Sequence, residues 1–243
     1  MTPVVNKTIS ICFDDGFRAS ADKVQRIFAQ RGQSACFCVL TAPELAEDPF
    51  IRAAPIADWA YWREAIAAGH EVAPHGYAHE YFGKLSFAAA CDSVQRSLDS
   101  FQQELPDFDS RRSVYHLAYL AAPVPVVQWI GERTLGARMA LGRSGRNDLA
   151  TWSPGQPIDC ITFAPPDADE VARQRIERFI KEEDGWLVLV FHGLDGEGWG
   201  TLTSYAWLRM LDDIAQAGIA LDPPNRTLRQ HISGSRALGK DAE

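Results

Sequence analysis

Residues 8–40 read TISICFDDGFRASADKVQRIFAQRGQSACFCVL, and this stretch decides the fold. Residues 8–13 and 35–40 are short apolar runs rich in Ile, Phe, Cys and Val, which predict two strands. Between them, residues 19–30 have helical periodicity, and Gly32 is a typical helix stop. A strand, a helix and a second strand in this order predict neighbouring parallel strands covered by a helix.

The same alternation continues along the chain. Further strands are predicted at 71–73, 113–120, 138–141, 158–163, 186–191 and 219–221. Helices are predicted at 58–68, 86–104, 124–135, 169–183 and 204–217, with a short one at 227–231 and an irregular insert at 42–56. About seven strand-helix units predict an α/β fold, a single irregular (β/α) barrel of about seven strands. We expect one domain over residues 1–232 and a flexible C-terminal tail at 233–243, which is rich in Gly, Ser and charge.

The amino-acid composition argues against several classes of protein. The 243 residues are 46% hydrophobic and 23% charged, which is typical of a globular protein. The net charge of −8 argues against a nucleic-acid binder. The longest apolar run, 186–191, is too short to cross a bilayer, so no membrane span is expected. The N-terminus as written lacks a secretory signal, which favours a cytoplasmic location unless a leader was removed.

Five cysteines without a dense pattern predict reduced thiols. Cys36 and Cys38 resemble a metal-binding pair, but they lie in a predicted strand, where alternation directs both to one face. The sequence holds no second pair of this kind. We therefore interpret both as small core residues in preference to zinc ligands.

Polar residues stand where three predicted strands end. Asp14 and Asp15 follow residues 8–13, and the pattern fits a turn and a functional pair equally well. His75 and His79 follow residues 71–73 and are four apart, which would place both on one face of a helical turn, although an accidental loop pair is the alternative. His192 directly follows the strongest strand. In a barrel these ends carry the chemistry.

Together these residues suggest hydrolytic chemistry. Two histidines and one carboxylate could bind a metal ion and leave a position open for water, which is the catalytic pattern of zinc sites. The second carboxylate could accept a proton, and the third histidine could protonate a leaving group. Such a set suits hydrolysis of an amide or an ester.

The sequence resembles the polysaccharide deacetylases, metal-dependent carbohydrate esterases that remove N-acetyl or O-acetyl groups. Residues 13–16 (FDDG) look like the first family motif, residues 69–79 (GHEVAPHGYAH) like the second and residues 189–192 (LVFH) like the last. Residues 116–119 (HLAY) fall where the third motif, Arg-x-Pro-Tyr, belongs. The resemblance spans roughly residues 6–222 and implies the irregular (β/α) barrel.

The resemblance also implies roles. Asp15, His75 and His79 would bind one divalent metal ion, zinc first, with cobalt or nickel as alternatives. Asp14 would be the general base on the metal-bound water, and His192 the general acid. The metal and a backbone N–H of the third motif would hold the oxyanion, and Tyr119 would contact an acetylated sugar or oligosaccharide.

Several positions depart from the family pattern. His116 replaces the Arg that normally orients the base, and Ala118 replaces the Pro. The fourth motif, Asp-x-x-Asp-Trp, has only a weak match at 148–152, where Thr151 would replace the Asp that tunes the acid histidine. Such losses around a metal site typically cost about 10–100-fold in activity or metal affinity, or they mark a different substrate. Trp152, Trp199 and Tyr205 could stack on a sugar, but packing is commoner, and no role is assigned to them.

Three functions remain open at this stage. The first is deacetylation of an N- or O-acetylated carbohydrate. The second is C–N hydrolysis of a small non-sugar amide, which the lost Arg and the lack of an export signal favour somewhat. The third is a catalytically silent carbohydrate-binding protein on the same scaffold.

Overall fold

The computed structural model describes residues 7–142 and 144–240. Its helices are α1 (Arg18–Arg31), α2 (Pro49–Ala53), α3 (Trp59–Ala67), α4 (Phe87–Glu104), α5 (Val124–Gly131), α6 (Ala168–Glu182), α7 (Ser204–Gln216) and α8 (Pro224–Lys240). Its strands are β1 (Thr8–Phe13), β2 (Cys36–Val39), β3 (Glu71–Pro74), β4 (Val114–His116), β5 (Gly136–Met139), β6 (Arg146–Asn147), β7 (Ile158–Asp159), β8 (Ile161–Thr162), β9 (Trp186–Phe191) and β10 (Ala220–Leu221). None of the described helices is long and apolar enough to cross a membrane.

The strands form two sheets. The larger has the order β3-β2-β1-β9-β6, with β10 beside β1 and β8 beside β9, and the smaller has the order β4-β5-β7. Only β6 runs antiparallel to its partner in the described ladders. The α/β class with a mostly parallel sheet is therefore confirmed. β3 lies beside β4, yet no described ladder joins the two sheets, so closure into a continuous barrel stays a prediction.

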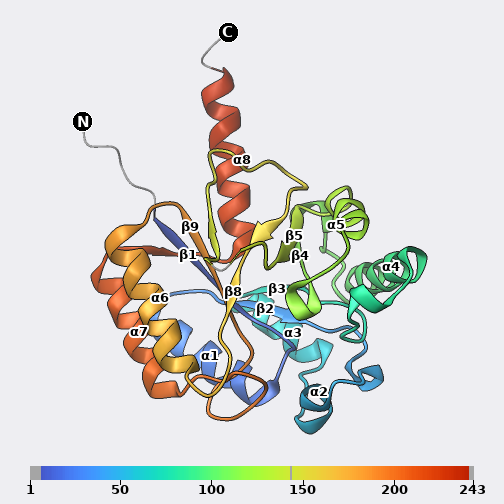
Figure 1. Cartoon of the computed structure of the whole chain (residues 1–243), viewed down its shortest axis with the longest axis horizontal. Coiled ribbons are helices and arrows are strands. Elements are labelled where there is room, and N and C mark those ends of the chain that lie inside the picture. The colour runs from blue at the N-terminus through green and yellow to red at the C-terminus, as the bar shows by residue number, and fades with distance from the viewer. Residues whose placement is uncertain (1–6, 143, 241–243) are drawn as a thin grey trace.

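Helices cover the outside of these sheets (Figure 1). α6 and α7 pack together on one flank and α4 and α5 on the opposite flank, while α8 stands at one end. The largest apolar cluster joins the outer faces of β1, β2 and β9 to α1, α3, α6 and α7, with the aromatic rings of Phe13, Phe28 and Trp207 in contact. Burial of each such side chain contributes about 1.5–3 kcal/mol, so this layer fixes the position of the central strands.

A second apolar cluster fills the space enclosed by the strands. Alternation along each strand sends odd and even residues to opposite faces. On β9, Leu187 and Leu189 pack outward against the helices, while Val188 and Val190 pack inward. Asp14 directly follows β1 and His192 directly follows β9, and both positions continue the inward face of their strand. Both side chains therefore lie over the ends of the strands.

Some predicted elements have different bounds. The strand predicted at 113–120 ends at His116, because Tyr119 and Leu120 have φ angles of 53° and 54°, which no strand accommodates. The segment 158–163 splits into β7 and β8, which pair with different sheets. α8 is longer than predicted and continues through residue 240, into the segment expected to be a flexible tail. The flexibility of that segment stays a prediction.

Candidate metal centre

The end of β1 places two carboxylates in different directions. The Asp14 N–H donates to the Phe191 carbonyl at 2.8 Å, so Asp14 still belongs to the sheet and continues its inward face. Asp15 leaves the extended conformation with φ of 75°. Because the backbone turns between them, the two adjacent side chains can have separate partners. Both are almost fully buried, with 1% and 2% exposed.

Two histidines converge on Asp15. His75 Nε2 lies 3.3 Å from Asp15 Oδ1, and His79 Nε2 lies 3.4 Å from the same oxygen. The predicted helical turn at 75–79 is wrong, because Gly76 and His79 have positive φ angles of 114° and 57° and the segment is a loop. The loop nevertheless brings both imidazoles to one point.

This group fits a metal ion. One atom each of Asp15, His75 and His79 lies within 4.8 Å of the others, and Asp15 Oδ1 has no hydrogen-bond partner among the described residues. His75 Nδ1 donates to the His116 carbonyl at 3.0 Å, which leaves Nε2 with its lone pair toward Asp15. Two imidazole nitrogens and one carboxylate oxygen suit zinc and neighbouring first-row ions.

Arg138 is a residue that sequence reasoning missed. It is fully buried on β5, and its Nη2 donates to Asp14 Oδ2 at 2.8 Å. The β4–β5 register pairs His116 with Arg138, so the arginine reaches Asp14 from the strand beside His116. The sequence signal was an Arg at the start of an otherwise apolar predicted strand; a charged residue is rarely buried unless it has a partner.

The charges around Asp14 and Asp15 favour their ionised forms. Burial raises the pKa of Asp14, but the positive charge of Arg138 and the nearby histidines outweigh it, so its pKa lies below the usual value. Burial also opposes ionisation of Asp15, yet its close contact with His75 and the positive charges that the three nearby histidines can carry lower its pKa to about 2. Both groups are therefore carboxylates near neutral pH.

Asp48 is a second residue that sequence reasoning missed. It lies in the insert predicted as irregular, where its side chain accepts from the Phe50 N–H and caps α2. Its Oδ2 accepts from the Tyr119 hydroxyl at 3.0 Å and lies 3.3 Å from His79 Nδ1. Asp48 therefore connects Tyr119 to a candidate metal ligand. The dipeptide Asp48-Pro49 is typical of a helix start, so the sequence could have indicated that Asp48 caps a helix. Nothing in the sequence indicated that Asp48 lies beside His79.

All six predicted site residues line one cavity of about 360 Å³, as the described residues place them. They are Asp14, Asp15, His75, His79, Tyr119 and His192. Tyr119 is 48% exposed, and its ring lies 4.6 Å from that of His79 between centroids. His192 packs edge-on against Trp199, with centroids 5.3 Å apart, and its Nδ1 has no hydrogen-bond partner among the described residues. The arrangement brings a candidate metal site, a further carboxylate and a third imidazole into one concave space.

The sequence model of the polysaccharide deacetylase family matches residues 2–122, which carry Asp14, Asp15, His75 and His79. The chain belongs to the polysaccharide deacetylase family. Comparison with curated proteins gives no match.

Solved structures of carbohydrate esterase family 4 (CE4) share the fold. The peptidoglycan deacetylase PdaC from Bacillus subtilis is 14% identical with a TM-score of 0.60, and the match covers 96% of this chain and 95% of that one. A family 4 carbohydrate esterase from Streptomyces lividans, in complex with acetate, is 15% identical (TM-score 0.57, 90% and 93% covered). A CE4 pseudoenzyme from Bacillus anthracis is 15% identical (TM-score 0.62, 92% and 66% covered).

Two of the expected departures from the family pattern differ in the structure from what the sequence predicted. His116 was predicted to replace the family Arg, but the arginine that donates a hydrogen bond to Asp14 is Arg138. Thr151 lines a separate surface cavity with Asp148, and Trp152 is packed in the interior cluster, so residues 148–152 place no group beside His192. Tyr205 is exposed on α7 and lies outside the cavity, whereas Trp199 lines it.

Proposed function

We propose that this chain is a metal-dependent hydrolase that removes an acetyl group from an N- or O-acetylated carbohydrate. Membership of the polysaccharide deacetylase family supports carbohydrate deacetylation. The observation that carries the finer proposal is the convergence of Asp15, His75 and His79 beside Asp14 in one cavity. A divalent ion bound there, with zinc the first choice, would lower the pKa of water and polarise the acetyl carbonyl.

The protein groups supply the proton transfers. Asp14 Oδ2 is held by Arg138, while Oδ1 has no hydrogen-bond partner among the described residues. Oδ1 is thus available to accept the proton that the attacking water loses. His192, which lines the same cavity, would deliver a proton to the departing amine or alcohol. Tyr119, fixed by its hydrogen bond to Asp48, would contact the substrate at the cavity mouth.

The size of the cavity keeps a second candidate open. A volume of about 360 Å³ is near the lower end of ligand pockets, which span roughly 300–1,000 Å³. Such a space holds one sugar ring with its acetyl group, or a small non-sugar amide, and leaves further sugar units outside. C–N hydrolysis of a small amide is therefore the second candidate.

Product analysis separates these functions. Protein reloaded with Zn²⁺ or Co²⁺ is given acetylated oligosaccharides, acetylated monosaccharides and small amides, and the release of acetate, amine or ammonia is measured. Acetate from the sugars supports the proposal, whereas amine or ammonia from the small amides alone supports the second candidate. Sugar binding with no product from any substrate would identify a silent binding protein.

The variant Asp14→Asn tests the base. It should lower turnover by about 10²–10⁴-fold, because general base catalysis is lost. The bound metal should remain, since Asp14 is outside the candidate ligand set. Full activity in this variant would rule out Asp14 as the base, and loss of the metal would assign Asp14 to the ligand set.

A further inference from the structure

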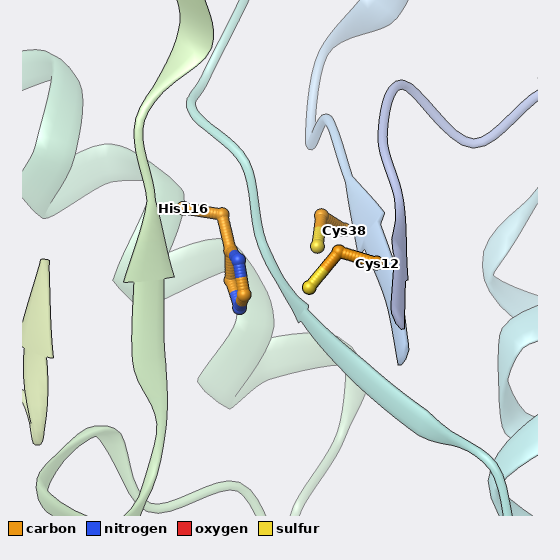
Figure 2. A group of neighbouring side chains, drawn as sticks. All are labelled: Cys12, Cys38 and His116. Carbon is orange, nitrogen blue, oxygen red and sulfur yellow. The ribbon is translucent and has the colours of Figure 1, made fainter. Parts of the chain in front are cut away.

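Below the candidate metal centre lies a second group of metal-ligating side chains. Cys12 on β1, Cys38 on β2 and His116 on β4 point toward one another in the interior (Figure 2). One ligand atom from each lies within 4.8 Å of the others. Cys36, which pairs with Cys12 in the β1–β2 ladder, joins them: its Sγ is 3.8 Å from Cys38 Sγ and 3.9 Å from His116 Nε2. All four side chains are fully buried.

The 3.8 Å between the sulfurs of Cys36 and Cys38 matches the separation of two ligands on one ion. Zn–S bonds of about 2.3 Å at tetrahedral angles separate two sulfurs by about 3.8 Å. Three cysteines and one histidine form a known closed zinc set, and thiolates favour zinc and Cu(I) over hard ions. Thiols are weak hydrogen-bond donors, so the contacts among them contribute little without an ion.

Unpaired polar atoms surround this group. His116 Nδ1 is buried without a hydrogen-bond partner among the described residues, and the same holds for Nε and Nη1 of Arg138. Arg138 is the β5 neighbour of His116, and it places a fixed positive charge beside the group. A positive charge and free N–H groups stabilise thiolates, the form in which cysteine binds metals.

We propose that Cys12, Cys36, Cys38 and His116 form a second, structural site for a thiolate-binding metal ion, with Zn²⁺ as its occupant. The site has no solvent-exposed ligand and would be filled during folding. β1 and β2 belong to the larger sheet and β4 to the smaller one, and no described ladder joins these sheets. The ion would therefore link the two sheets where backbone hydrogen bonds do not.

Metal stoichiometry and cobalt spectra test this site on the full chain. The protein is produced and refolded under reducing conditions with Zn²⁺, and in parallel with Co²⁺. We expect two zinc ions per wild-type chain, and an intense near-ultraviolet thiolate-to-cobalt charge-transfer band. The band should remain in His79→Ala, which removes a ligand only from the other site, and should disappear in Cys38→Ser. Cys91→Ser, which changes a thiol outside the group, is the matched control and should keep the band and both ions.

The wild-type measurement decides the proposal even where a cysteine variant does not fold. One ion per wild-type chain without a thiolate band overturns it, as does a band that survives in both Cys38→Ser and Cys12→Ser. Thermal unfolding adds an independent readout, because filling the site should raise the Tm of His79→Ala. Acetate release does not enter these measurements, so a failure of the second site is distinct from a failure of the proposed deacetylase function.

Discussion

At the scale of single residues, Asp14 depends on a partner that lies far away in the sequence. A carboxylate this deeply buried is ionised only if a charge or several donors compensate for the lost water. Arg138 provides that charge through a hydrogen bond of 2.8 Å, and it holds one oxygen while the other stays free. Arg138 is therefore a positioning residue for the proposed base, and its removal should have two separable effects.

The first prediction concerns Arg138→Met. Loss of the positive charge should raise the pKa of Asp14, so the base stays protonated up to a higher pH and the acidic limb of the activity profile moves upward. We expect kcat to fall by about 10–100-fold, as for other groups that support a metal site. The free energy of unfolding should fall by about 3–5 kcal/mol, because Asp14 would be left as an unpaired buried charge. The pH profile of kcat and denaturant unfolding measure these effects.

Arg138→Lys provides the comparison for this variant. It keeps a positive charge but not the planar fork, so its acidic limb should lie between those of wild type and Arg138→Met. An acidic limb that does not move in Arg138→Met would contradict the role given to Arg138, even if the variant loses stability.

The second prediction concerns Asp48, whose Oδ2 lies 3.3 Å from His79 Nδ1. Carboxylates beside a ligating histidine orient the ring and raise its basicity. Asp48→Asn should therefore weaken metal binding by about 10–100-fold, measured by competition with a chelator. Asp58→Asn is the matched control, because Asp58 also caps a helix, α3, through a backbone N–H. Equal metal affinities in the two variants would show that Asp48 does not act on His79.

At the scale of elements, the sequence predicted the central strands, but it did not predict the register between neighbouring strands. The apolar runs at 8–13 and 186–191 predicted the two central strands and placed Asp14 and His192 at their ends. Arg138 could not be assigned, because pairing between β4 and β5 is a tertiary property that no local pattern encodes. Cys36 and Cys38 lie in the interior cluster, as predicted, but their approach to Cys12 and His116 is likewise a property of the fold that no local pattern encodes.

The third prediction concerns the docking of α8. Glu71 at the start of β3 accepts from the backbone N–H of Asn225 in the first turn of α8. Burial raises the pKa of Glu71 to about 7, from an ordinary value of 4.5. Between these pH values the folded chain binds more protons than the unfolded one. Stability due to this group is therefore complete below about pH 4.5 and is lost as the pH rises to about 7.

Glu71→Gln keeps the accepting oxygen and removes the titration. At pH 8 we expect the free energy of unfolding of this variant to be about 1–2 kcal/mol higher than that of wild type. At pH 4 we expect the two free energies of unfolding to be equal. Urea unfolding at both pH values is the measurement, and Glu64→Gln on the exposed face of α3 is the control. An equal gain at both pH values would show that charge burial at Glu71 is not the cause.

At the scale of the whole molecule, the boundary between β3 and β4 is held at both ends. At one end His75 Nδ1 donates to the His116 carbonyl, and at the other Asn225 Oδ1 accepts from the Val114 N–H while its own N–H donates to Glu71. The candidate metal ligand His75 thus takes part in joining the two sheets. Protonation of this histidine should affect the whole site.

The fourth prediction is the pH dependence that follows from this coupling. In the metal-free protein, burial lowers the pKa of His75, but Asp14 and Asp15 outweigh burial and raise it, whereas burial lowers the pKa of His79. A proton therefore competes with the metal first at His75 as the pH falls. We expect metal affinity to drop by about tenfold per pH unit below the His75 pKa, and activity at fixed metal concentration to fall below about pH 6.

Adding excess metal shows whether protonation of the histidines or of Asp14 causes the loss of activity at low pH. If protonated histidines release the ion, a higher Zn²⁺ concentration should restore activity at pH 5.5, because metal and proton compete for the same nitrogen atoms. Added Zn²⁺ would not restore activity that is lost because Asp14 is protonated. Because the pKa of Asp14 lies below its usual value, this second loss of activity is expected at more acidic pH. Titration of activity with Zn²⁺ at several pH values separates the two causes. A profile that stays flat down to pH 4, or a loss that added metal never reverses, would contradict the assignment of His75 as a ligand.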